Sequence, residues 1–308
     1  MRRFTLRPGP ILSKKERGRK ERSTMSKTAV LLITCPDQKG LVCAIANFLF
    51  EHGGNILHAD QHQDAELGLF LMRVEWALED FALDFSQIPA RFDPIARRLG
   101  MQWRLAVSSH RPRAAVFVSR QTHCLVDLIY RYRAGELACE IPLVVSNHPD
   151  GRWIAESCGI PYHQMEVSPG QKEKVEARQI ELLDEHRVDL LVLARYMQIL
   201  SPTMASRFPN RIINIHHSFL PAFSGARPYH QAYERGVKLI GATSHYVTEI
   251  LDDGPIIEQD VVRISHRDGV EELVQKGQDL EKVVLSRAVR WHVENRILVY
   301  GRRTVVFS

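Results

Sequence analysis

The 308-residue sequence lacks several patterns that mark common classes of protein. It has no apolar run near the roughly 20 residues that a membrane-spanning helix needs, so we expect no membrane segment. It also has no G-x-G-x-x-G or Walker A pattern. Phosphate-binding loops need glycine for close backbone approach, so this absence disfavours nucleotide and sugar-phosphate substrates.

Cysteine pairs and metal-binding clusters are missing as well. The five cysteines are odd in number and form no C-x-x-C pair, which predicts free thiols in a reducing compartment, the cytoplasm. His58 and His62 are four residues apart, but in an extended strand this spacing amounts to about 13 Å. One ion cannot bridge that distance, so we expect no metal site.

Excess positive charge is absent from most of the chain. The formal net charge is +5 and the pI is about 9.0, but residues 1–24 hold nine Lys and Arg residues against Glu16 and Glu21. The remainder has 32 basic and 34 acidic residues, a net charge of −2. This mildly acidic body argues against a nucleic-acid partner. Residues 1–24 have few apolar residues and no periodicity, which predicts a disordered extension and favours Met25 as the functional start.

The amino-terminal part predicts a small sheet domain over residues 25–108. Apolar residues at helical spacing in 41–52 are followed by Gly53 and Gly54, which favours a helix that ends there. The expected elements are a strand at 28–34, that helix, strands at 55–64 and 67–78, a helix at 86–99 and a strand at 101–107. The order β-α-β-β-α-β is that of the ferredoxin-like fold.

The first strand-to-helix turn of this domain carries Pro36-Asp37-x-x-Gly40-Leu41-Val42. This pattern and the element order resemble the ACT family of small-molecule regulatory domains. Free N–H groups at the helix start suit a small carboxylate, so we expect an effector at Asp37, Gly40 and Leu41. The resemblance implies an amino acid, glycine or methionine, and a homo-oligomer that covers the open sheet edge. An assembly module without a ligand is the alternative.

Residues 109–308 predict a second domain of a different type. After a polar linker at 108–113, strands alternate with helices: strands at 114–118, 141–146 and 189–194, and helices at 124–133, 151–158 and 172–186. This alternation predicts a parallel, Rossmann-like α/β sheet whose site lies at the carboxyl ends of the strands. A strand at 304–307 is expected to extend an edge.

Polar side chains interrupt an apolar strand at Asn214 and His216. Residues two apart in a strand point to the same side, so both side chains are expected to enter one cleft. Asp252 lies in an acidic turn between the strands expected at 241–247 and 256–262, where catalytic residues are often held. An amide, an imidazole and a carboxylate in one cleft are typical of acid–base chemistry.

These residues lie in motifs that resemble the folate-dependent formyltransferase family over roughly residues 112–290. The motifs are Asn214-Ile-His216, the Pro221 loop, Gly241-Ala-Thr-Ser-His245 and Leu251-Asp-Asp-Gly-Pro255. The resemblance implies catalytic roles for Asn214, His216 and Asp252. It also implies that a folate lies against two loops, at Met197, Gln198, Leu200, Val247, Thr248 and Glu249. The apolar residues of the first loop suit a flat heteroaromatic ring.

Together with the ACT-like domain, the chain from Met25 is similar to hydrolytic members of that family. The resemblance implies hydrolysis of 10-formyltetrahydrofolate to formate and tetrahydrofolate, which supplies formate to purine synthesis and balances the one-carbon folate pool. The folate is the substrate, so no cofactor is implied. Glycinamide ribonucleotide formyltransferases carry a Gly/Ser/Asn-rich phosphate loop where this chain has Thr122-His-Cys124. The alternatives are formyl transfer to an amine acceptor of that kind and a non-catalytic folate or amino-acid sensor.

Overall fold

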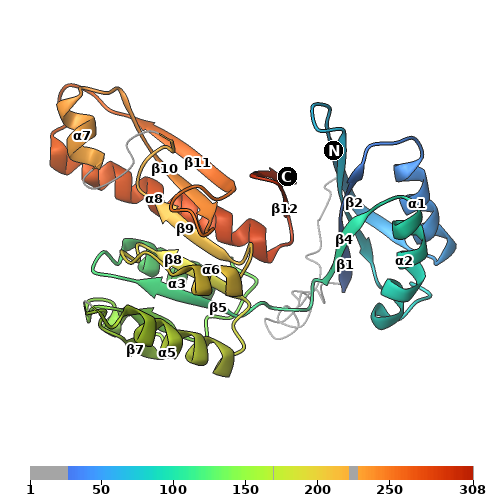
Figure 1. Cartoon of the computed structure of the whole chain (residues 1–308), viewed down its shortest axis with the longest axis horizontal. Coiled ribbons are helices and arrows are strands. Elements are labelled where there is room, and N and C mark those ends of the chain that lie inside the picture. The colour runs from blue at the N-terminus through green and yellow to red at the C-terminus, as the bar shows by residue number, and fades with distance from the viewer. Residues whose placement is uncertain (1–26, 169, 222–227, 308) are drawn as a thin grey trace, which may run out of the picture.

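A computed structural model describes residues 27–168, 170–221 and 228–307 of the chain (Figure 1). The basic extension expected at residues 1–24 lies outside these residues. Two sheet domains are connected by the segment between β4 (Gln102–Val107) and β5 (Ala114–Val118). Within the described ranges, no helix has the length and apolar character needed to cross a membrane.

The amino-terminal domain confirms the ferredoxin-like order. Its four-stranded antiparallel sheet has the order β2-β3-β1-β4, built from β1 (Thr28–Pro36), β2 (Asn55–Asp64), β3 (Leu69–Ala77) and β4. Helices α1 (Leu41–Glu51) and α2 (Ile88–Arg98) share a hydrophobic core with the sheet. The helix expected at 86–99 begins as a 3₁₀ turn, Phe85–Gln87, and α2 starts where a proline stands in its first turn.

The second domain is built on a seven-stranded sheet with the order β11-β10-β9-β8-β5-β6-β7. Five strands pair in parallel, and β10 and β11 pair antiparallel. The strands besides β5 are β6 (Val144–Ser146), β7 (Tyr162–Gln164), β8 (Leu190–Ala194), β9 (Ile212–His216), β10 (Leu239–Tyr246) and β11 (Ile256–Arg263). The helices are α3 (His123–Arg133), α4 (Arg152–Glu156), α5 (Lys172–Glu185), α6 (Pro202–Arg207), α7 (Pro228–Glu234) and α8 (Val270–Val293).

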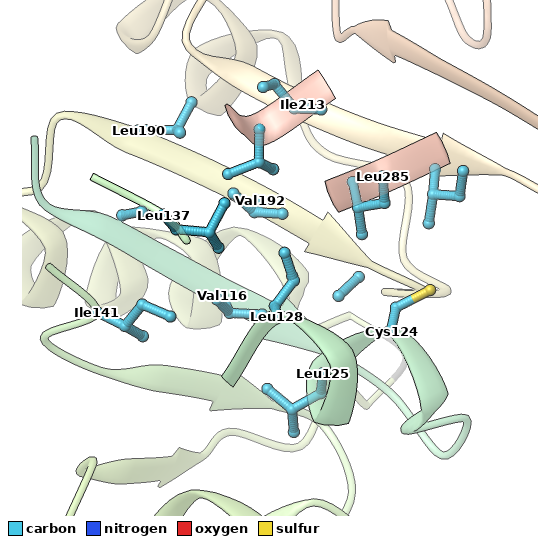
Figure 2. Packing of buried hydrophobic residues seen from close by; sticks show 14 of the residues in the cluster. Val116, Cys124, Leu125, Leu128, Leu137, Ile141, Leu190, Val192, Ile213 and Leu285 are labelled. Atoms are coloured by element: carbon cyan, nitrogen blue, oxygen red, sulfur yellow. The ribbon is translucent and has the colours of Figure 1, made fainter. Parts of the chain in front are cut away.

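Both faces of the large sheet are buried, as a parallel sheet requires. On one face, Val116, Val192 and Ile213 of the sheet pack with Leu128 of α3 and Leu285 of α8 (Figure 2). On the other face, apolar residues of α5 and α6 pack against the sheet. The carboxyl ends of β8 and β9 are thereby fixed between two layers of helices.

The carboxyl-terminal segment differs from the edge strand expected at 304–307. It forms a separate hairpin of β12 (Ile297–Tyr300) and β13 (Arg303–Val306). Leu298 and Phe307 are buried against Val30, Leu32 and Leu71 on the face of the amino-terminal sheet away from its helices. The hairpin therefore gives the small sheet a second hydrophobic layer and joins the two domains, as Figure 1 shows for β12.

Candidate active site

Asn214 and His216 lie on the same side of β9, as the strand spacing predicts. The antiparallel neighbour β10 places His245 directly opposite Asn214. Asn214 Nδ2 lies 3.2 Å from His245 Nε2, and His245 Nδ1 donates to the Tyr246 carbonyl oxygen over 2.9 Å. The backbone of β10 thus fixes the orientation of a second histidine ring beside the two expected residues.

Asp252 completes the cluster from the loop between β10 and β11. Its Oδ2 lies 3.3 Å from His216 Nδ1 and its Oδ1 lies 3.6 Å from His245 Nε2. The hydrogen bond from His216 and the adjacent His245 hold the pKa of Asp252 well below its usual range. Asp252 is therefore a carboxylate throughout the neutral pH range and supplies a fixed negative charge beside His216.

The backbone of this loop is closely constrained. Asp252 has a φ of +55°, in the left-handed region that non-glycine residues rarely adopt. At Gly254 a Cβ would lie 1.7 Å from the Tyr246 carbonyl oxygen, so only glycine fits. The Tyr246 N–H donates to the Pro255 carbonyl over 2.9 Å. The loop is thus closed onto the end of β10, which holds the Asp252 carboxylate over the two histidines.

His216 is buried, and its ring contacts two neighbours of different charge, Asp252 and His217. Its Nε2 is buried and has no hydrogen-bond partner among the described residues. The ring stacks on His217 with centroids 5.2 Å apart. Burial and the charge of Arg195 lower the pKa of His217 to about 4, so His217 is neutral at physiological pH. His216 therefore has a carboxylate on one side and an uncharged ring on the other.

The nine residues expected for catalysis and folate binding come together in one cavity of about 350 Å³. Met197, Gln198 and Leu200 lie in the β8–α6 loop, and Val247, Thr248 and Glu249 follow β10. Apolar side chains of both loops remain exposed, namely Met197, Ile199, Ile250 and Leu251. Two exposed apolar loops facing one cavity are typical of a site for a flat ring.

Hydrogen bonds from the scaffold hold the first of these loops. The Met197 N–H donates to Ser119 Oγ over 3.0 Å, and Ser119 Oγ donates to Asn147 Oδ1 over 2.7 Å. At the other end, Ser201 caps α6 by accepting from the Met204 N–H over 3.2 Å. The loop is therefore largely preformed.

A buried charge cluster behind the cavity was missed by the sequence analysis. Glu281 of α8 is only 1% exposed and accepts hydrogen bonds from Tyr229 Oη at 2.6 Å and His123 Nε2 at 2.7 Å. Arg195 Nε, from the cavity wall, lies 3.4 Å from the same carboxylate. Burial alone would raise the pKa of Glu281, but the His123 hydrogen bond and the Arg195 charge hold it below its usual value.

A glycine of α8 makes this cluster possible. A Cβ at Gly277 would lie 2.1 Å from Tyr229 Oη, so this glycine makes room for the tyrosine, and α8 runs through it from Val270 to Val293. His123, Cys124 and Glu281 are close enough to hold a cation. The carboxylate, however, is already engaged by two donors and the Arg195 guanidinium, so the donor set does not suit one.

A second cavity, of about 480 Å³, lies in the amino-terminal domain. It is lined by the three residues expected to bind an effector, Asp37, Gly40 and Leu41, together with Gln63 of β2. Gln63 Nε2 donates to Asp37 Oδ2 over 2.5 Å. Gly40 has a φ of +90°, which turns the chain sharply into α1 and exposes the first N–H groups of the helix.

Comparisons with known proteins match both domains. The family described as Formyl transferase matches residues 112–289, and the ACT domain family matches residues 29–87. A Synechocystis protein named formyltetrahydrofolate deformylase is 55% identical over 91% of this chain and 99% of its own length. The crystal structure of a formyltetrahydrofolate deformylase from Pseudomonas syringae is 48% identical, with a TM-score of 0.91 over 93% of this chain and 96% of that chain.

A more distant match covers only the second domain. The crystal structure of glycinamide ribonucleotide transformylase 1 from Symbiobacterium toebii is 34% identical, with a TM-score of 0.62 over 65% of this chain and 96% of that chain. The likeness over almost the full length is therefore to the two-domain proteins.

The buried Glu281 cluster predicts that phenylalanine variants at two tyrosines of α7 differ in their free energy of unfolding. Tyr229→Phe removes a hydrogen bond to a buried carboxylate, so we expect the free energy of unfolding to fall by about 2 kcal/mol in urea titrations. Tyr233→Phe is the matched control because Tyr233 lies one turn later on the same helix and is exposed. Equal losses in the two variants would contradict the role of the Tyr229 hydroxyl.

Proposed function

We propose a mechanism on the premise that the chain belongs to the formyl transferase family and, within it, to the formyltetrahydrofolate deformylases. The chain is a hydrolase that converts 10-formyltetrahydrofolate to formate and tetrahydrofolate. The observation that carries the mechanism is the convergence of Asn214, His216 and Asp252 in one cavity with two apolar loops. The loops would hold the pterin, and the three polar side chains would surround the formyl group.

Hydrolysis requires stabilisation of the negative charge that forms when water attacks the formyl carbon. Asn214 Nδ2 is a donor at the cavity wall, and His216 becomes a second one once it has taken the proton of the attacking water. Removing one such donor typically lowers the rate by about 100- to 1000-fold. We assign Asn214 and His216 to the developing oxyanion.

Asp252 orients the His216 ring and places a negative charge beside it. Its pKa lies so far below neutrality that it is a weak base, so direct removal of a proton from water is unfavourable. It can accept from His216 Nδ1–H and stabilise the imidazolium form of that ring. The role that fits its pKa is therefore to hold His216 and the attacking water in place.

His216 is the group that moves the proton in this scheme. Water adds to the formyl carbon and gives a proton to His216, the C–N10 bond breaks, and His216 returns the proton to N10. Formic acid then loses its proton as formate leaves, so atoms and charges balance. The unpartnered Nε2 is consistent with this role, since a buried polar atom without a partner calls for an explanation.

Water as acceptor fits the structure better than an amine carrying a phosphate. Residues 119–124 contain no glycine, and His123 and Cys124 are turned into the buried cluster with Glu281. Among the described residues of this segment, no glycine turn is available to cradle a phosphate. This favours hydrolysis over transfer, and the catalytic cluster argues against a silent sensor.

Three further proposals concern the whole protein. The free cysteines, of which Cys43 is exposed, support a reducing compartment, the cytoplasm. The strand β2 is an edge of its sheet and nine of its ten residues are exposed, which supports a homo-oligomer that covers this edge. The formate released would supply purine synthesis and the reaction would balance the folate pool, as the family resemblance implies.

The amino-terminal cavity is proposed to bind an amino-acid effector, glycine or methionine. The match to the ACT family supports amino-acid binding at this domain. The helix start at Leu41 offers N–H donors to a carboxylate, and the Asp37 carboxylate in the same cavity suits an ammonium group. The zwitterion of an amino acid meets both requirements.

Formate release without any added amine tests the function. Incubation with 10-formyltetrahydrofolate alone should release formate.

Substitution of the two adjacent aspartates of the β10–β11 loop, Asp252 and Asp253, tests the mechanism. We expect Asp252→Asn to lower kcat at least about 100-fold, because it removes the charge beside His216. Asp253→Asn is the matched control, since Asp253 pairs with the exposed Arg302, and should stay within about twofold. An Asp252→Asn enzyme with nearly full kcat would refute the assignment.

The effector proposal predicts a selective loss of regulation. Glycine and methionine titrated at fixed substrate should change the rate of the parent protein, and Gly40→Val should abolish that response while leaving the basal rate intact. Gly301→Val is the control, because Gly301 also has a positive φ and open space around it but lies in the β12–β13 turn. Absence of any response in the parent, or a response that survives in Gly40→Val, would contradict this placement of the ligand.

A further inference from the structure

A third cavity, of about 790 Å³, lies between the two domains and belongs to neither site described above. One wall is β4 of the amino-terminal sheet, and the opposite wall is formed by residues 209–211 before β9, the end of β10 and the end of α8. The hairpin strand β12, which Figure 1 places between the domains, contributes apolar side chains. Both domains are therefore needed to form this cavity.

Positive charge in this cavity is not balanced. Arg104 pairs in register with Leu32, whose side chain packs on the hairpin, so Arg104 points to the interdomain side of β4. Among the described residues, its guanidinium has no hydrogen-bond or ion-pair partner. Arg211 donates to the Arg207 carbonyl and lies over the Phe208 ring, and within the described chain it has no carboxylate partner.

The negative charge available on the walls is small. Asp189 is the only carboxylate among the described lining residues. It already accepts from the Arg113 N–H over 2.9 Å and lies 3.9 Å from His110 Nε2. The two guanidiniums are thus left to pair with something other than the described lining residues.

Arg104 and Arg211 both lower the pKa of the same imidazole, that of His292. Burial, then the charges of Arg104 and Arg211, lower the pKa of His292 to about 3. Burial also lowers the pKa of Arg104, although its side chain remains accessible from the cavity. A guanidinium that is open to a ligand and yet poorly hydrated is well suited to bind an oxyanion.

We propose that the interdomain cavity binds a small organic anion whose phosphate or carboxylate group is held by Arg104 and Arg211. Guanidinium groups recognise both kinds of oxyanion through paired N–H donors. The volume lies in the range of small-molecule sites, and Leu32, Leu298 and Val299 offer an apolar surface to the organic part of the ligand. Such a ligand would bridge the two domains.

The cavity wall is connected to the catalytic cluster. Tyr246 Oη is hydrogen-bonded to His292 Nδ1 over 2.7 Å at the cavity wall. The backbone of the same tyrosine accepts from catalytic-site His245 and donates to Pro255, which closes the Asp252 loop. An anion that shifts Tyr246 therefore shifts the loop that carries Asp252, so occupancy of the cavity changes the rate of hydrolysis.

Calorimetric titration of the full chain tests this site. The probes are inorganic phosphate, glycerol 3-phosphate and succinate, each with tetrahydrofolate saturating the catalytic cavity, so that phosphate and carboxylate ligands are distinguished. We expect saturable binding of at least one probe and a dissociation constant at least about tenfold higher in Arg104→Gln and in Arg211→Gln. Arg98→Gln, an exposed arginine of α2 outside the cavity, should bind as the parent does.

A second readout places the ligand in the cavity. Binding of an anion beside Arg104 and Arg211 should shift the ring resonances of His292 in NMR spectra, and this shift should be absent in both arginine variants. No saturable binding of any probe to the parent would overturn the proposal. Binding that leaves the His292 resonances unmoved, or that persists unchanged in both arginine variants, would overturn it as well.

Discussion

The contact between the Asp252 carboxylate and the His216 imidazole is the interaction around which the catalytic domain is organised. It joins a loop to a strand end, and neither element alone brings the two groups within 3.3 Å. The buried sheet fixes His216, because β9 lies between β8 and β10 with helices on both faces. Gly254 fixes Asp252, because the loop passes so close to the Tyr246 carbonyl that no side chain fits there.

Two sets of residues control the charge around this contact, one beside His216 and one behind the cavity. Nearest to the reaction, His217 is kept neutral, so it places no positive charge beside the His216 ring on which it stacks. Farther back, Glu281 offsets the charge of Arg195 at the cavity wall. A lone buried arginine or glutamate would be costly, whereas here the two charges pair with each other and His123 and Tyr229 donate to the glutamate. The same cluster includes His123 and Cys124, which stand where a phosphate-binding loop would need glycine.

Much of this arrangement could be predicted from the sequence, and what was missed has a physical reason. The alternation of strand side chains placed Asn214 and His216 on one side, and the loop position of Asp252 was sufficient to bring it to the same cavity. His245 was part of a motif but not assigned a role, since its function depends on strand pairing with Asn214. Glu281 gave no signal because a carboxylate on a long helix is ordinarily exposed, and its burial follows from α7 packing at Gly277. Residues 304–307 were predicted as an edge strand, without the hairpin partner, because sequence periodicity does not show which sheet a strand covers.

The most direct test of the account is the rate of formate release by Gly254→Ala. Its added methyl group must displace the loop from the Tyr246 carbonyl and so move Asp252, while Asn214, His216 and His245 keep their identities. We expect at least about a 100-fold loss of kcat with tetrahydrofolate binding and the far-UV circular dichroism spectrum retained. Gly135→Ala, at an open turn of the same domain, should keep most of its activity. A Gly254→Ala enzyme with the kcat of the parent would contradict the claim that the Asp252–His216 contact governs the reaction.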